Sequence, residues 1–147
     1  MPRESIKFTT DELRSFLKPE RRAVLATIAP DTKAWGDAVA CVFMDDRLYF
    51  RVPIKTKSLA NIRRDPRVCC TVESHPLGAA YYTIKGAMLH GKADEVKGDA
   101  ARKVKALLDR VPDPVEPSRT DGVIFSVGID DVASFDFGKI KFRYDPK

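Results

Sequence analysis

Apolar and polar side chains alternate along several stretches of this sequence, and this period of two constrains the fold more than any other feature. In residues 48–52 the apolar side chains share one face, opposite Tyr49 and Arg51. Such alternation predicts β-strands that bury one face. Six or seven strands are expected, some of them apolar on both faces: Arg22–Ala29, Ala34–Met44, Leu48–Val52, Arg67–Glu73, Ala79–Lys92, Gly122–Ile129 and Val132–Tyr144. Gly86, inside one of them, indicates a bulge.

Short turns join the first three of these strands. Pro30–Lys33 and Asp45–Asp46 supply turn residues, so the three strands should form an antiparallel meander. Strands and helices do not alternate regularly, which argues against a doubly wound parallel sheet. We therefore expect a mainly β protein, a small antiparallel barrel with peripheral helices. Helices are predicted to begin after Thr9 or Thr10, after Thr56 and at Lys97, the last of them running to Arg110.

Length and composition indicate one soluble domain. A chain of 147 residues, 44% hydrophobic and 32% charged, is expected to fold around one core over residues 1–147. No apolar run approaches the roughly 20 residues of a membrane helix, so we expect no membrane partner. The N-terminal residues lack the apolar core of a secretory signal, and three cysteines, an odd number, argue against a disulfide framework. These features predict a cytoplasmic protein.

The sequence contains no motif for metal binding or for catalysis by a side chain. His75 and His90 are the only histidines, and neither has a cysteine or carboxylate at the spacing of a ligand set. The three cysteines lie in apolar strand patterns without an activating partner. Nucleotide-binding glycine loops and nucleophile elbows are missing. We predict no metal site and no catalytic nucleophile.

The net charge of +5 raises the possibility of a nucleic-acid partner. The aromatic residues that would stack on bases lie in predicted strands, at spacings typical of core packing. No nucleic-acid-binding signature is present. We therefore expect no nucleic-acid partner, and the positive charge is better matched to a small anionic ligand.

Lys55–Ser58, which we call the basic turn, joins a predicted strand to a predicted helix. Pro53 removes a donor from the strand ladder and ends the strand, and Thr56 can cap the helix that follows. Two ammonium groups and two hydroxyls therefore accompany the unpaired N–H groups of a helix N-terminus, a combination that favours phosphate. The alternative is an ordinary solvated turn with an N-cap.

The order of these elements resembles the split-barrel flavoprotein family of pyridoxamine phosphate oxidase and its deazaflavin-using relatives. The family pattern is an aromatic strand, a cluster of Ser/Thr and Lys/Arg, an Asn-aliphatic pair, and Asp/Asn-Pro-Arg-aliphatic at the next strand. The matching segments are Leu48–Phe50, Thr56–Ser58, Asn61–Ile62 and Asp65–Val68. The similarity is good over residues 16–96 and extends to the remainder in outline.

The resemblance implies a six-stranded antiparallel split β-barrel with Greek-key topology, paired as a homodimer, with a flavin-type cofactor in each of two interface clefts. FMN is the expected cofactor, and a deazaflavin of the coenzyme F-420 type is the alternative. By position, the cofactor phosphate would contact Arg51, Lys55, Thr56, Lys57 and Ser58. The ring system would lie along Val52, Pro53 and the backbone of Val39, Ala40 and Cys41.

The predicted last strand allows two interpretations of its cations. Lys139, Lys141 and Arg143 share one face, and they could form a solvated, charged edge that discourages aggregation. Alternatively, Lys139 of the partner subunit could reach the cofactor ring.

Three departures from the family pattern matter for function. Ser58 stands where the family usually has a lysine, residues 39–43 lack the usual proline, and the C-terminal residues lack the tryptophan and arginine pattern of true pyridoxamine phosphate oxidases. That substrate is therefore not expected. The resemblance implies an oxidoreductase that passes a hydride to or from a small organic substrate, with no catalytic acid or base from the chain. The alternative is a non-catalytic carrier of flavin, haem, tetrapyrrole or lipid.

Overall fold

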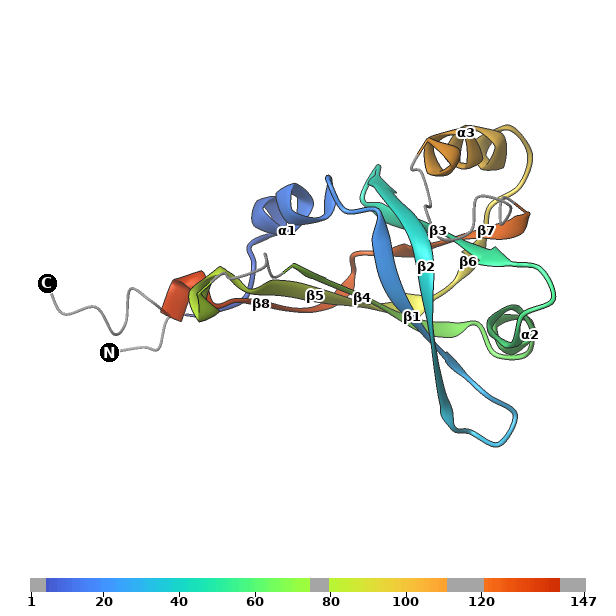
Figure 1. Cartoon of the computed structure of the whole chain (residues 1–147), viewed down its shortest axis with the longest axis horizontal. Coiled ribbons are helices and arrows are strands. Elements are labelled where there is room, and N and C mark those ends of the chain that lie inside the picture. The colour runs from blue at the N-terminus through green and yellow to red at the C-terminus, as the bar shows by residue number, and fades with distance from the viewer. Residues whose placement is uncertain (1–4, 75–79, 111–120, 141–147) are drawn as a thin grey trace, which may run out of the picture.

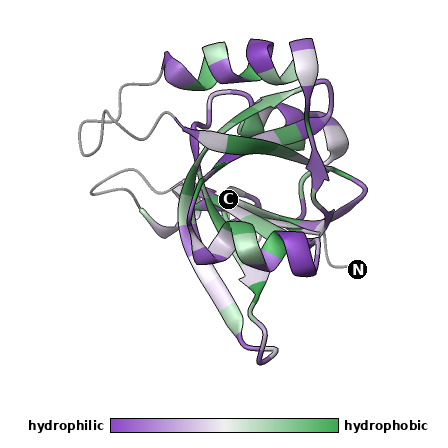
Figure 2. Ribbon diagram, turned by 90° about the vertical axis from the view of Figure 1, so that its right-hand side faces the viewer, coloured by the Kyte–Doolittle hydropathy of each residue, from purple (hydrophilic) through white to green (hydrophobic). Residues whose placement is uncertain are grey.

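The computed structural model describes residues 5–74, 80–110 and 121–140, and its strands form one antiparallel sheet that curls into a barrel-like shape (Figures 1 and 2). The strand order is β6-β7-β3-β2-β1-β4-β5-β8. The strands are β1 Arg22–Ile28, β2 Ala34–Met44, β3 Arg47–Pro53, β4 Arg67–Ser74, β5 Lys85–Lys92, β6 Asp94–Glu95, β7 Gly122–Gly128 and β8 Asp131–Asp136. The helices are α1 Thr10–Leu17, α2 Lys57–Arg64, α3 Gly98–Asp109 and a 3-10 turn, η1, at Tyr81–Thr83.

Strand β2 belongs to both halves of the sheet. Its first part, residues 34–40, pairs with β1, and its last part pairs with β3 from Cys41, opposite Phe50, to Met44, opposite Arg47. Beyond the Cys41–Phe50 pair, β2 and β3 diverge, and β3 continues along β7 as far as Pro53, opposite Gly122. Helix α2 packs against β1, β2 and β3 at this divergence. The antiparallel split barrel expected from the sequence is therefore confirmed.

The barrel interior is filled by the alternating apolar residues that the sequence pattern predicts. Leu25, Phe50, Cys70 and Leu89 have no solvent exposure, and the Phe50 ring stacks on Phe125 at 6.0 Å between centroids. A second, smaller cluster lies outside the barrel wall, where Val104 and Leu108 of α3 cover one face of β2 and β7.

Both predicted helix caps are present. The Thr9 hydroxyl accepts a hydrogen bond from Glu12 N at 3.2 Å while the Glu12 carboxylate accepts one from Thr9 N at 2.8 Å, a reciprocal capping box. The Thr56 hydroxyl accepts from Leu59 N at 3.3 Å and donates to Pro53 O at 2.8 Å. These two bonds hold the basic turn between β3 and α2.

The number and limits of the strands differ from the expectation. The described residues form eight strands, against the six of the resemblance and the six or seven of the sequence pattern; the additional strand, β6, is a two-residue pairing with β7 that is too short to produce a periodic pattern. Strand β5 begins at Lys85 rather than Ala79, since Tyr81–Thr83 form a 3-10 turn closed by Thr83 N to Ala80 O at 2.9 Å.

The last strand was predicted to reach Tyr144, and this was wrong. It ends at Asp136, whose carboxylate accepts a hydrogen bond from Gly138 N at 2.8 Å, and residues 138–140 form a helical turn. Lys139 is therefore not on a strand face, and Lys141 and Arg143 lie outside the described residues. Residues 75–78 and 112–117, for which the sequence suggests a loop and a proline-rich link, also lie outside them.

The expected bulge at Gly86 is also absent, because β5 pairs continuously with β4 and β8 through this residue. Close packing against a neighbouring ring explains the glycine at this position instead. A Cβ atom at this position would lie 2.4 Å from the Phe135 ring, so any side chain here would displace that ring.

We predict that α2 depends on one buried hydrogen bond to β1. Asn61 Nδ2 donates to Thr27 Oγ1 at 3.0 Å, and both residues are almost completely buried. Asn61→Ala should lower the free energy of unfolding by about 1–3 kcal/mol, because it leaves a buried hydroxyl without its donor. Urea unfolding of this variant, of Thr27→Val and of the double variant measures the coupling. If the two losses simply add, the bond does not anchor α2.

A second prediction concerns acid stability. Lys139 Nζ donates to Glu12 Oε1 at 2.8 Å and to Lys7 O at 2.6 Å, linking α1 to the residues after β8. The bond from Lys139, followed by that from Thr9 N, lowers the pKa of Glu12 to about 2. A depressed folded pKa contributes stability that is complete above the unfolded value and is lost as the pH falls, here from about 5 to about 2. Unfolding measured across this range should show the loss, and Lys139→Met should remove most of it. An unchanged acid profile in Lys139→Met would contradict this assignment.

Candidate functional site

The basic turn is a fixed loop at one end of the curled sheet, beside α2 (Figure 1). Lys55 has a positive φ of 61°, which turns the chain sharply after β3. Thr56 then caps α2, and Lys57 is its first residue. In the first turn of α2 the N–H of Leu59 donates to the Thr56 hydroxyl, whereas the N–H groups of Lys57 and Ser58 have no carbonyl partner within the helix and could meet an anion.

The two lysines of the basic turn are both exposed. Lys57 Nζ lies 4.6 Å from the centroid of the Trp35 ring, a cation–π contact. In the described part of the chain, neither Lys55 nor Lys57 forms an ion pair with a carboxylate. Two ammonium groups and a helix N-terminus thus converge without a neutralising salt bridge.

Two residues of the site were missed by sequence reasoning. Trp35 and Asp37 lie in the part of β2 that pairs only with β1. Asp37 Oδ2 accepts a hydrogen bond at 3.3 Å from the Ser58 hydroxyl, and Ser58 is fully buried. Ser58 therefore faces a carboxylate. The one available signal for this part of the site was that the only tryptophan of the chain lies in a polar hairpin. Trp35 is far from the basic turn in sequence, so its contact with Lys57 could not be predicted.

The expected ring-contacting segment lies where β2 separates from β3. Val39 and Cys41 point into the barrel core, while Ala40 packs toward the cluster under α3. Val52 is fully buried and Pro53 is half-buried at the end of β3. The backbone of residues 39–41 and residues 52–53 thus borders the gap between the two strands, next to α2.

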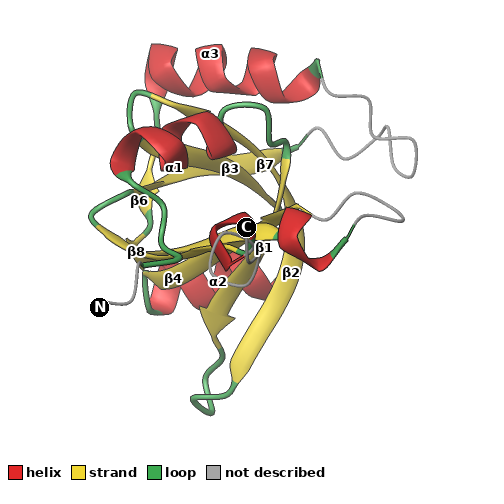
Figure 3. Ribbon diagram, turned by 90° about the vertical axis from the view of Figure 1, so that its left-hand side faces the viewer, coloured by secondary structure: helices red, strands yellow, loops and turns green. Residues whose placement is uncertain are grey.

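Arg51 and Lys139 are not part of the basic turn within one chain. Arg51 Nη1 lies 2.5 Å from Asp109 Oδ1 of α3, and its side chain is 10% exposed. Lys139 lies beside α1, at the other end of the sheet from α2 (Figures 1 and 3). The structure brings together Lys55, Thr56, Lys57 and Ser58, and it leaves these two cations elsewhere.

The three arginines that follow the basic turn also have partners in the chain. Arg63 pairs with Glu95 at 2.5 Å, and Arg67 pairs with Asp65 at 2.7 Å. Arg64 donates to the carbonyl of Ile28. Among the described residues, the two lysines of the turn are therefore the nearby cations without a carboxylate partner.

No described group near the turn is activated as a nucleophile. Burial raises the pKa of the Cys41 thiol to about 12 and also raises that of Cys70. Burial likewise raises the pKa of Cys69, so all three side chains stay as thiols. Within residues 5–74, 80–110 and 121–140, no three His, Cys, Asp or Glu side chains are grouped as metal ligands. None of the helices in these ranges is long and apolar enough to cross a membrane.

These features make the basic turn and the apolar segment beside it a candidate site for an anion. The turn offers ammonium groups and backbone N–H donors, which match the chemistry of a phosphate group. The strands next to it offer backbone and aliphatic surface.

Solved structures with this fold come from proteins with differing descriptions. A conserved hypothetical protein, Rv2991 of Mycobacterium tuberculosis, is 24% identical with a TM-score of 0.78, over 99% of this chain and 95% of that one. A FAD-binding protein of Mesorhizobium loti is 20% identical with a TM-score of 0.68, over 87% and 93%. A structure described as an F420 reductase is 21% identical with a TM-score of 0.62, over 82% and 94%.

A search of curated proteins gave no match. The family model described as pyridoxamine 5'-phosphate oxidase matches residues 9–135, which include the whole sheet except the end of β8. The resemblance drawn from the sequence is thereby confirmed: the chain belongs to the pyridoxamine 5'-phosphate oxidase family.

Proposed function

We propose that this protein binds FMN, or a deazaflavin in its place, and passes a hydride between that cofactor and a small organic substrate. The observation that carries the proposal is the basic turn, where two exposed lysines without carboxylate partners meet the N-terminus of α2. The family to which the chain belongs and the similar structures described as FAD-binding and as an F420 reductase support a flavin-type ligand.

The residues of the chain would bind and orient the cofactor. Lys57 and Lys55 would hold its phosphate by charge-assisted contacts, assisted by backbone N–H groups of the first turn of α2. Residues 39–41 and 52–53 would lie along the ring and keep water from one side of it. When bound, a flavin or deazaflavin supplies the hydride chemistry at its ring.

We also propose that two copies of the chain pair through the outer face of the sheet. One row of residues lies in register across β2, β1, β4, β5 and β8: Ala38, Val24, Thr71, Met88 and Ala133. This row contains no charge, and Val24 is 53% exposed. An uncharged, partly apolar row across five strands is better suited to contact with a protein surface than to water.

Pairing of this kind is tested by solution mass. Light scattering should give twice the 16.4 kDa of one chain. Val24→Glu should give a monomer that is still folded, because it places a charge in the proposed interface without touching the core. Glu73→Gln, at the exposed end of β4, serves as a control and should remain dimeric. A wild-type monomer at micromolar concentration would contradict the pairing.

Lys57→Ala tests the phosphate contact. A charge-assisted contact contributes on the order of 1.5–3 kcal/mol, so the variant should bind FMN or the deazaflavin about ten- to a hundredfold more weakly. The fold should lose at most about 1 kcal/mol, the value of an exposed cation–π contact with Trp35. Titration with each cofactor, followed by fluorescence of the cofactor and of Trp35, measures both affinities.

Riboflavin, which has no phosphate, provides the control for this titration. It should bind wild type and Lys57→Ala equally. If riboflavin and FMN lose the same affinity, Lys57 acts through the fold and the phosphate assignment is wrong. Binding without turnover of any reducible substrate would favour the non-catalytic carrier over the oxidoreductase.

A further inference from the structure

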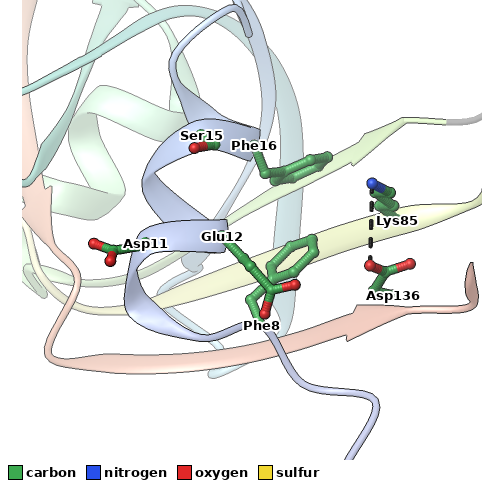
Figure 4. A pocket seen from close by; sticks show the side chains of 7 residues that line it. All are labelled: Phe8, Asp11, Glu12, Ser15, Phe16, Lys85 and Asp136. Carbon is green, nitrogen blue, oxygen red and sulfur yellow. Dashed lines mark ion pairs between the residues drawn. The ribbon is translucent and has the colours of Figure 1, made fainter. Parts of the chain in front are cut away.

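A second concave site lies at the other end of the sheet from the basic turn, between α1 and the adjoining ends of β5 and β8 (Figure 4). Its volume is about 390 Å³, within the range of small-molecule pockets. Phe8, on the segment before α1, and Phe16, on α1, form its apolar wall, with ring centroids 5.1 Å apart and planes inclined by 36°.

The acidic groups at the rim have cationic partners. Asp11 shares Arg14 with Asp46, at 3.0 and 2.8 Å, and the Asp11 side chain is 93% exposed. Glu12 pairs with Lys139 at 2.8 Å. Ser15 also lines the pocket, and the charged side chains that the strands contribute are Lys85 and Asp136.

Lys85 and Asp136 form an ion pair that is too long for a hydrogen bond. They are directly opposite in the β5–β8 ladder, yet Lys85 Nζ lies 4.0 Å from Asp136 Oδ2. The Asp136 side chain is only 12% exposed. Its Oδ1 accepts from Gly138 N at 2.8 Å, whereas Oδ2 receives no hydrogen bond from any residue that the structure describes. Among the described residues no fully buried side-chain oxygen lacks a hydrogen-bond partner, so Oδ2 is accessible from the pocket and can accept a donor from a ligand.

We infer that this pocket binds a planar aromatic ligand that carries adjacent N–H and C=O groups, that is, a lactam or an aryl carboxamide. The ligand N–H donates to Asp136 Oδ2 and its carbonyl accepts from Lys85, whose side chain is 47% exposed, so both contacts are charge-assisted. The ring packs against Phe8 and Phe16. A ligand with two acceptors would be repelled by Asp136, and one with two donors by Lys85.

The experiment follows backbone amide shifts of the full-length chain during titration with quinolin-2-one, a planar bicyclic lactam. The shifts should cluster at residues that line the pocket. 1-Methylquinolin-2-one, which keeps the ring and the carbonyl but has no N–H, should bind about tenfold more weakly, as expected for loss of a hydrogen bond to a charged group. Equal binding of the two compounds would overturn the inference, as would shifts located elsewhere.

Variants separate the polar pair from general packing. Lys85→Met should weaken quinolin-2-one binding about tenfold, while Lys92→Met, a matched change at the far end of β5, should not alter it. Asp136→Asn should weaken it similarly by turning the acceptor into a donor. Because Asp136 is buried, Lys85→Met decides the question if Asp136→Asn does not fold. Unchanged affinity in Lys85→Met would contradict the proposed contact. No flavin is needed, so the outcome is independent of cofactor binding at the basic turn.

Discussion

The transfer of β2 from one strand partner to another is the constraint on which the rest of the structure depends. Because β2 pairs with β1 before Cys41 and with β3 after it, the sheet opens between β2 and β3. Helix α2 occupies that opening, and the hydrogen bond between Asn61 and Thr27 fixes it there. The same divergence brings the first part of β2 close to the N-terminus of α2. If β2 and β3 stayed paired along their whole length, these two segments would not meet.

Electrostatic pairing then decides which cations remain for a ligand. The arginines around α2 and β3 are held by carboxylates or carbonyls of their own chain, as Arg51 is by Asp109. The Arg51 guanidinium is costly to redirect, because its side chain is only 10% exposed and would leave its carboxylate partner. Lys55 and Lys57 are exposed and carry no such cost. The net positive charge of the chain is thus less informative about binding than the distribution of its ion pairs.

Local patterns in the sequence were sufficient for most of the fold. Period-two alternation located β1 to β4 to within a residue or two, and the capping residues located α1 and α2. The misses have two causes. The role of Gly86 and the pairing of β6 depend on contacts with distant residues, which no local period reports. The end of β8 is a local turn, in which Gly138 N donates to Asp136, and the alternation beyond it concealed that turn. Family resemblance supplied the overall topology, which periodicity could not.

For the candidate site, too, the sequence predicted the residues that are contiguous and missed the contacts that the fold creates. Lys55–Ser58 are contiguous, so their shared position at a helix start could be deduced from sequence. The contact between Asp37 and Ser58 depends on how β2 is placed in the sheet, which the local sequence does not report. Arg51 is directed toward α3 by its ion pair with Asp109. The attachment of the segment before α1 has a further consequence for folding. Phe8 N donates to Ser134, 126 residues away, and Asp136 N donates to the carbonyl of Ile6, so these bonds close a loop that contains most of the sheet. Contacts so distant in sequence are expected to form late, because the entropy of closing a long loop is lost before they contribute.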